Sequence, residues 1–499
     1  MPPTVLRAAS ARVAIISSIA FFSILSLAAS ITSRGFLEAD ACTHYLYARF
    51  ALDEPHYLVN IWGRPIVTAL YALPANLAGR FGVRTTSLVL AVAIALVAYA
   101  IARRLKFRRP VLALVFTLAQ PLLFLHSFSE LTELPFALLL GLAFLAYVDQ
   151  RWLYFTLFVS ILPLARPEGF GFVALAALAL VLHRRPWWIL WLPVPLAVWC
   201  YTGWTLYGIV DYPWWQWLSR NWPYAEKSAY QSGSVFHFLM LMPAVVSPLL
   251  FPATALGVWR CFRRVRFRSV NRALVALIPL MILAGHSVLY ATGRMASSGE
   301  VRYMLVVAPF WALLGAKGWE WLFARRRWPR EVQLAMLAAI LPIFVNRWYQ
   351  VLPLAYMQDW IEARETAAWV RDTSLGHDYP KLASSHPGLF YFMDISATDR
   401  YRVVEWRKGN VEHAPNGVIL VWDWVYGTHN SDADRVITVE DLLRAGWVQI
   451  PVPRVQDTRP APNTRLVFLS PRDALGRPTD VTHASGAATS AARGSPSPP

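Results

Sequence analysis

The stretch that decides the fold is "VAIISSIAFFSILSLAASITSRGFLEADACTHYLYAR", residues 13–49. Its first part, residues 13–33, is apolar and has the length of a helix that crosses a bilayer, which needs about 20 such residues. A cleaved signal peptide is the alternative, but the apolar core is long for one. Acids, a histidine, tyrosines and an arginine follow directly. We therefore predict a membrane-spanning helix that leads into a polar segment at the membrane surface.

The composition of the whole chain agrees with a membrane protein. Of 499 residues, 56% are hydrophobic and 15% charged, the mean hydropathy is +0.38, and 23 residues are Trp. This balance is too apolar for a soluble enzyme of such length. The net charge of +17 would suit a nucleic-acid partner, but most Lys and Arg stand in short tracts between apolar runs, as topology signals do. We expect no nucleic-acid partner, and no disulfide framework from the three cysteines.

Apolar stretches of membrane-spanning length predict about eleven transmembrane helices. They cover residues 13–33, 85–102, 110–126, 134–148, 152–165, 170–182, 187–204, 238–259, 273–291, 303–323 and 332–348. With this assignment the dense basic tracts alternate onto one face, which the positive-inside rule makes cytoplasmic. We expect a multi-pass protein of the bacterial inner membrane, with a cytoplasmic N-terminus and a periplasmic or extracellular C-terminus.

The composition changes near Tyr356. An amphipathic helix is predicted over residues 357–374, a second helix over 438–446, and short strands at "KLASS", "NGVILVWDW", "WVQIPV" and "TRLVFLS". The fold class is therefore an α-helical polytopic membrane protein with a small C-terminal α/β outer domain. We expect a transmembrane domain over residues 1–350, the α/β domain over 351–472, and a disordered Ser/Ala/Pro-rich tail over 473–499.

The acids after the first span are the first candidates for chemistry. If a helix restarts after Gly35, Asp40 and His44 share one face, because they are four residues apart. Glu38 then belongs to a different stripe. The two carboxylates cannot point into one cavity unless the helix begins between them. The alternative is that Asp40 merely caps the helix and His44 is an interfacial polar residue.

More polar side chains are predicted at the same outer face. Plain explanations exist for them: helix capping by the glutamates, an ion pair within the turn "RPEG", or anchoring of an arginine at lipid headgroups. Ionisable groups near hydrocarbon are costly, so several of them on one face predict a polar cavity at membrane depth that opens outward. These residues are Arg64, Glu130, Glu133, Arg166, Glu168, Arg302 and Tyr303.

Five segments together resemble the GT-C superfamily of polytopic glycosyltransferases. They are "FLEADACTHYLYAR", "WGRPIVTALYALP", "SELTELPFALLLGLA", "RPEGFGFVALAALAL" and "GEVRYMLVVAPFWALLGAKG", and they extend over most of the predicted spans. The chain is most similar to bacterial relatives of the dolichyl-phosphate-mannose mannosyltransferases. It has Glu38-Ala39-Asp40 where an adjacent Asp-Glu pair would be expected, which leaves the identity of the catalytic base open.

The resemblance implies transfer of a sugar, a hexose such as mannose, from a polyprenyl-phosphate donor to an acceptor hydroxyl, with inversion. The acceptor would belong to a glycan, a lipid or a protein. The resemblance implies a carboxylate base, for which Asp40 is the first candidate and Glu38 the second. It also implies a guanidinium that stabilises the leaving phosphate. The phosphate candidates are Arg302, Arg166 and Arg64; the candidates for binding or orienting the acceptor are Glu130, Glu133, His44, Glu168 and Tyr303.

Two other classes of function are weighed against this one. A transporter or channel would place ionisable residues in the middle of its spans, where this chain has almost none. An envelope polysaccharide polymerase or ligase would favour large Arg-rich outer loops. No cofactor is certain: some members of the superfamily use a divalent cation, but no cluster of His, Asp and Glu has convincing ligand spacing here.

Overall fold

The computed structural model describes residues 3–207, 232–263, 270–295, 297–323, 352–373, 375–415, 417–428, 433–451 and 465–470. The chain divides into two units, Met1–Ala355 and Tyr356–Pro499. The predicted span 332–348 and the predicted tail 473–499 lie outside the described residues.

The first unit is built from the apolar runs, which form helices. Every span predicted within the described residues coincides with one helix or with two in series. The helices are α1 (Pro3–Thr32), α2 (Ala39–Phe50), η1 (Pro55–Val59), α3 (Pro65–Arg104), α4 (Val111–Leu118), α5 (Pro121–His126), α6 (Glu133–Val148), α7 (Trp152–Ala165), α8 (Gly169–Leu182), η2 (Pro186–Trp191), α9 (Val194–Tyr207), α10 (His237–Val246), α11 (Phe251–Phe262), α12 (Val270–Thr292), η5 (Val301–Val307) and α13 (Ala308–Leu322).

Several of these helices have the length and composition of membrane spans. Within the described residues four helices qualify, or five if α10 and α11, which are bent by 111° at their junction, count as one broken span. Helices α6, α7 and α8 are apolar but shorter. An α-helical polytopic membrane fold is thus confirmed, while the total of about eleven spans stays a prediction.

Helix α3 contains a sharp break that shapes the polar end of the unit. The backbone leaves helical geometry at Ala78 and Gly79, and Gly79 has φ +56° and ψ −142°. A Cβ on Gly82 would lie 2.1 Å from the carbonyl oxygen of Pro74, so only glycine allows the two arms to come this close. The first arm packs beside α2, and the second arm is the long apolar part.

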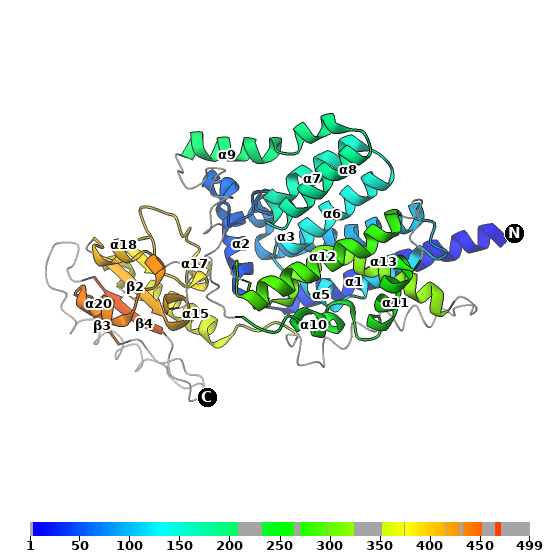
Figure 1. Cartoon of the computed structure of the whole chain (residues 1–499). Coiled ribbons are helices and arrows are strands. Elements are labelled where there is room, and N and C mark those ends of the chain that lie inside the picture. Colours follow the sequence, from blue (N-terminus) through cyan, green and yellow to red (C-terminus); the bar gives the residue numbers. More distant parts are fainter. Residues whose placement is uncertain are drawn as a thin grey trace, which may run out of the picture. The chain divides into compact units, whose positions relative to one another are not determined.

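Packing brings the ends of distant segments together. Helix α6 lies between α3 and α7, and α8 follows on α7 (Figure 1). The 3₁₀ helix η5 packs against α6, α10 and α12. The start of α6, the end of α7 and the start of η5 therefore meet, and α2 reaches the same place from the first span.

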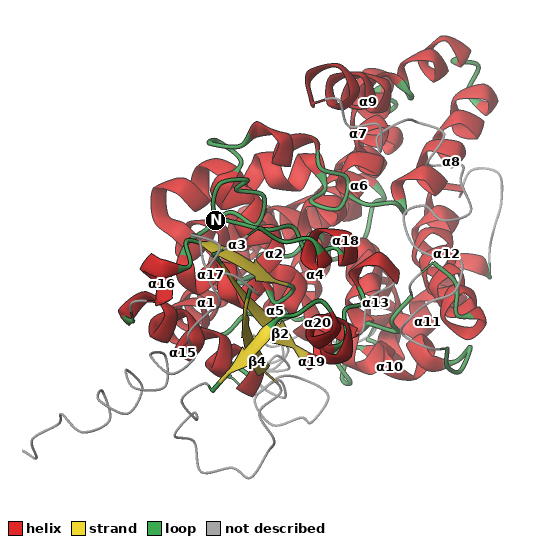
Figure 2. Cartoon of the chain, turned by 90° about the vertical axis from the view of Figure 1, so that its left-hand side faces the viewer, coloured by secondary structure: helices red, strands yellow, loops and turns green. Residues whose placement is uncertain are grey.

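The second unit is an α/β domain, as predicted. Its four strands, β1 (Lys381–Ser384), β2 (Val418–Asp423), β3 (Val448–Ile450) and β4 (Arg465–Leu469), form a sheet in the order β1-β2-β4-β3. Strands β1 and β2 are parallel, and β4 runs antiparallel to both β2 and β3. All strands that the structure describes, yellow in Figure 2, belong to this unit. Its helices are α15 (Gln358–Asp372), α16 (Leu375–Asp378), α17 (Pro387–Met393), α18 (Lys408–Glu412), α19 (Trp424–Thr428), η7 (Ala433–Arg435) and α20 (Val439–Arg444).

One face of the sheet holds the core of the second unit. Because side chains alternate along a strand, Leu420 and Trp422 of β2 point to the same face and join Phe468 of β4 in a buried cluster. The indole of Trp422 donates a hydrogen bond of 2.7 Å to the carbonyl of Ile437. Thr438 and Asp441 form a capping box at the start of α20, which explains why that helix begins there.

Candidate active site

Helix α2 begins between the two acids, which is the condition under which both reach one place. Glu38 occupies the N-cap position without a capping hydrogen bond from its side chain, and Asp40 lies in the first turn. Both carboxylates contact Arg302: Nη1 lies 3.0 Å from Glu38 Oε2, and Nη2 lies 2.6 Å from Asp40 Oδ2. Asp40 is therefore engaged with a guanidinium and does not serve as the cap of α2.

Arg302 is the centre of the cluster. It lies near the start of η5, just after Gly299, whose φ of +74° turns the chain. Besides Glu38 and Asp40, its Nε pairs with Glu300 and lies 3.9 Å from Glu133 Oε1. The side chain is 9% exposed, so four carboxylates surround a nearly buried cation.

A second guanidinium, that of Arg166, belongs to the same cluster because it also binds Glu133. Its Nη1 donates to Glu133 Oε1 at 2.5 Å and to the hydroxyl of Thr132 at 2.8 Å, and its Nη2 donates to Glu168 Oε1 at 2.9 Å. Arg166 is the C-cap of α7, and Glu133 is the first residue of α6. The turn "RPEG" thus contains an ion pair between Arg166 and Glu168, which was the plain explanation for these residues, and Arg166 also connects the turn to α6.

The surroundings of Glu38 and Asp40 shift the pKa values of these two acids in opposite directions. Burial raises the pKa of Glu38 to about 8, and the charges of Glu300, Glu133 and Asp40 add to this, although Arg302 opposes it. Burial would also raise the pKa of Asp40, but the charge and hydrogen bond of Arg302 outweigh it and hold that pKa below its usual range. At neutral pH Glu38 therefore carries a proton, whereas Asp40 is ionised.

His44 and Arg64 are close enough to Asp40 to act on its charge. The His44 ring stacks on Trp62 with centroids 4.6 Å apart, and burial lowers the pKa of His44 to about 3, so the imidazole is neutral. The charge of Arg64 contributes to the low pKa of Asp40. Arg64 has φ +61° and donates from Nη1 to the carbonyl of Ile61 at 3.0 Å.

Tyr303 bridges the two guanidiniums. Its ring centroid lies 5.9 Å from the guanidinium carbon of Arg302 and 5.7 Å from that of Arg166. The ring also stacks on His286 with centroids 4.8 Å apart, and its hydroxyl lies 2.8 Å from Ser298 Oγ.

The structure thus gathers most of the residues singled out in the sequence, but Glu130 is elsewhere. It is fully buried and binds Arg80 and Arg84 of α3. Residues that sequence reasoning did not select complete the cluster. Glu300 was visible beside Arg302, and His286 of α12 lies with Nε2 3.5 Å from Glu168 Oε1. A histidine inside an apolar span was the available signal for His286.

Several buried polar atoms of the cluster have no hydrogen-bond partner among the described residues: Glu133 Oε2, Glu168 Oε2 and His286 Nδ1. Such atoms are costly unless water or a ligand satisfies them. Within the part of the chain that the structure describes, no group of three or more His, Cys, Asp or Glu is placed to hold a metal ion. The cluster provides carboxylates, guanidiniums and the neutral imidazole of His44, which suit proton transfer and anion binding.

The first unit is a set of largely apolar helices, several of membrane-spanning length, and a small α/β unit follows it, as predicted. Two solved structures of ArnT from Cupriavidus metallidurans share the fold. The structure in the apo state has a TM-score of 0.58 and 15% sequence identity, covering 93% of this chain and 98% of that chain. The structure bound to undecaprenyl phosphate has a TM-score of 0.54 and 14% identity, covering 91% and 97%. No protein-family model and no curated protein sequence matches the chain.

Proposed function

We propose that the protein is an integral-membrane glycosyltransferase that moves a sugar from a polyprenyl-phosphate donor to an acceptor hydroxyl with inversion. The observation that carries this proposal is the contact of Asp40, an ionised and 42% exposed carboxylate, with the nearly buried cation of Arg302. A base and an anion-binding group in contact are what this reaction needs. The ArnT structure bound to undecaprenyl phosphate supports the donor class, because it has the same fold.

The reaction assigns one task to each group. Asp40 accepts the proton of the acceptor hydroxyl as its oxygen attacks the anomeric carbon. The bond from that carbon to the phosphate oxygen breaks on the opposite side, which inverts the centre. The polyprenyl phosphate leaves with the electron pair, and Arg302 stabilises its charge. The low pKa of Asp40 keeps the base ionised at neutral pH, at the expense of some basicity.

The other predicted residues have supporting roles in this scheme. Arg166 and Arg64 are further candidates for the donor phosphate. Arg166 also holds Glu133 in place, since it donates to both Thr132 and Glu133. Glu133, Glu168, His44 and Tyr303 would bind or orient the acceptor. We further propose a hexose such as mannose as the sugar, and a bacterial inner membrane as the location, with the cluster on the periplasmic side.

The test is transfer by the purified protein in detergent from a panel of synthetic undecaprenyl-phosphate-linked hexoses to an envelope extract, followed by mass spectrometry of the products. We expect one sugar of the panel to be transferred. Asp40→Asn should abolish transfer, because a general base contributes about 10² to 10⁴ in rate. Its thermal unfolding should remain cooperative, which shows that the variant is folded. Transfer by Asp40→Asn at the wild-type rate would reject Asp40 as the base.

A further inference from the structure

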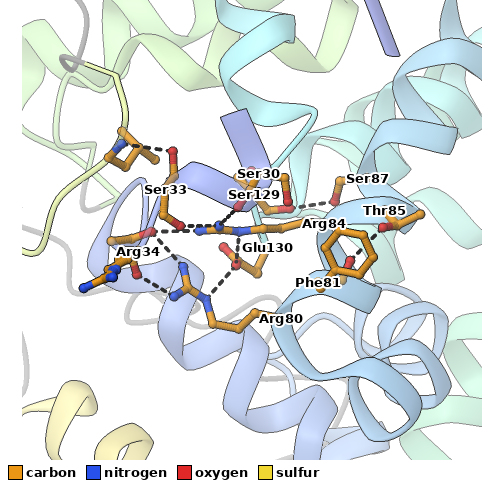
Figure 3. A network of polar contacts seen from close by, with 12 residues as sticks. Ser30, Ser33, Arg34, Arg80, Phe81, Arg84, Thr85, Ser87, Ser129 and Glu130 are labelled. Carbon is orange, nitrogen blue, oxygen red and sulfur yellow. Dashed lines mark hydrogen bonds and ion pairs between the residues drawn. The ribbon is translucent and has the colours of Figure 1, made fainter. Parts of the chain in front are cut away.

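We infer that Arg80, Arg84 and Glu130 are positioning residues that fix the segment carrying Glu38 and Asp40; this inference rests on the proposed function. The three side chains form a polar network within the first unit, at the end of α1 (Figure 3). Both arginines bind the same oxygen of Glu130: Arg80 Nε lies 3.2 Å and Arg84 Nε 2.9 Å from Oε1. Glu130 is 0% exposed and Arg84 4%.

The remaining nitrogens of both arginines bind the backbone that leads to the candidate site. Arg84 Nη1 donates to the carbonyls of Ser30 at 3.0 Å and Ser33 at 2.7 Å, and its Nη2 donates to that of Gly35 at 2.8 Å. Ser30 belongs to the last turn of α1, whose carbonyls have no partner within the helix. Arg84 therefore caps α1 and holds the turn that follows it.

Arg80 binds the same turn as Arg84 and shares the carbonyl of Gly35 with it. Its Nη1 donates to the carbonyl of Arg34 and its Nη2 to that of Gly35, both at 2.7 Å. Its guanidinium carbon also lies 3.7 Å from the ring centroid of Phe36. Five hydrogen bonds from two side chains thus reach the backbone of residues 30–35.

The opposite side of this segment is also fixed. The amide of Gly35 donates to the carbonyl of Leu354 at 2.8 Å, and the amide of Leu354 donates to Ser33 Oγ at 3.0 Å. A Cβ on Gly35 would lie 2.2 Å from the carbonyl oxygen of Ala355. The segment lies between the arginines of α3 and residues 354–355, so it has little freedom to shift.

The fixed segment, residues 30–35, lies directly before the two acids of the candidate site. Only Phe36 and Leu37 separate it from Glu38, the N-cap of α2, and Asp40 follows in the first turn. A displacement of about 1 Å is enough to lower catalysis strongly, because general-base catalysis depends on the distance to the reacting proton. Glu130 is fully buried, and its Oε1 binds both Arg80 and Arg84; its part is to hold the two cations at the correct place on the second arm of α3.

Arg80→Gln is the variant of choice, because Arg80 is 12% exposed and its loss leaves the fully buried Arg84–Glu130 pair intact. Arg80→Lys is the conservative variant, and Arg104→Gln is the matched control. Arg104 is on the same helix and pairs with Asp149 at 2.6 Å, but at the opposite end of α3. We expect Arg80→Gln to lower kcat about tenfold or more with KM for the donor within about threefold. Arg80→Lys should lose less, and Arg104→Gln nothing.

A second readout does not depend on activity. Cys42 is fully buried on α2, so in a Cys200→Ser/Cys261→Ser background its alkylation by a maleimide reports movement of that helix. Arg80→Gln should speed this alkylation, and Arg104→Gln should not. The inference is overturned if Arg80→Gln leaves the alkylation of Cys42 unchanged, if it leaves kcat unchanged, or if it lowers kcat and donor affinity together with the melting temperature. If the wild type transfers no sugar, the proposed function fails, while unchanged Cys42 reactivity would overturn the positioning role independently.

Discussion

Glu38 and Asp40 are two residues apart, and both carboxyl groups contact Arg302. Their pKa values are nevertheless shifted in opposite directions. Burial raises the pKa of Glu38 to about 8, while the bond to Arg302 lowers that of Asp40. Two carboxylates near one guanidinium cannot both ionise without repulsion, so one of them keeps its proton. We therefore predict that Glu38→Gln, which mimics the protonated acid, retains transfer activity within about tenfold at pH 7, whereas Asp40→Asn does not. The measurement is the initial rate of sugar transfer; loss of activity in Glu38→Gln alone would reverse the assignment.

The same pair predicts a pH dependence. Because the pKa of Glu38 is raised, its proton is present below about pH 8 and is lost above it. The added negative charge then opposes binding of a donor phosphate, so kcat/KM should fall several-fold between pH 7 and pH 9. No fall in kcat/KM is expected between pH 7 and pH 5, because the pKa of Asp40 is lowered and its carboxylate therefore stays ionised over this range. The profile of Glu38→Gln should lack the alkaline fall; if it keeps that fall, another group is responsible.

Arg302 provides a third prediction at this scale. Its loss leaves Glu133 with Arg166 as a remaining partner, whereas Asp40 and Glu38 lose the cation that they contact directly. Arg302→Ala should therefore weaken binding of undecaprenyl phosphate by about tenfold or more, since a charge-assisted pair to phosphate is lost. Binding is measured by titration in nanodiscs, with Arg104→Gln as the control. An unchanged affinity would show that Arg302 serves the carboxylates and not the phosphate.

The site also shows what could be read from single residues and what could not. Asp40, Arg302 and Arg166 could be selected because ionisable groups near hydrocarbon are costly, and Tyr303 because it follows Arg302 directly. Their grouping around Arg302 could not be predicted from the sequence. It depends on the packing of η5 against α6, and no local sequence pattern indicates this packing. Glu130 illustrates the limit: its position beside Glu133 favoured a substrate role, yet its side chain faces Arg80 and Arg84.

At the scale of elements, the break in α3 is the feature that periodicity alone did not reveal. The apolar stretch from residue 85 predicted a span, but the helix begins at Pro65 and changes direction at Gly79. A residue with a Cβ is strained at φ +56° and ψ −142°, by about 1 to 3 kcal/mol. Gly79→Ala should therefore lower the melting temperature in detergent by several degrees.

Gly171 offers a matched control for this prediction. It lies inside α8, and a Cβ there would meet nothing within 4 Å. Gly171→Ala should leave the melting temperature unchanged or raise it slightly, because alanine is favoured over glycine within a helix by roughly 0.5–1 kcal/mol. Equal effects of the two substitutions would show that the break at Gly79 does not require glycine.

At the scale of the whole molecule, the orientation in the membrane connects the charge pattern to the proposed chemistry. The candidate site lies at the start of α2, the start of α6 and the end of α7, whereas Arg103 and Arg104 lie at the far end of α3. The positive-inside rule assigns the arginine-rich ends to the cytoplasm, so the site and the second unit should be periplasmic. A reporter that works in one compartment only distinguishes the two orientations. Alkaline phosphatase fused after Pro499 should be active and green fluorescent protein there should be dark, while the reverse is expected for fusions after Lys106. Active phosphatase after Lys106 would place Asp40 at the cytoplasmic surface and contradict a periplasmic acceptor.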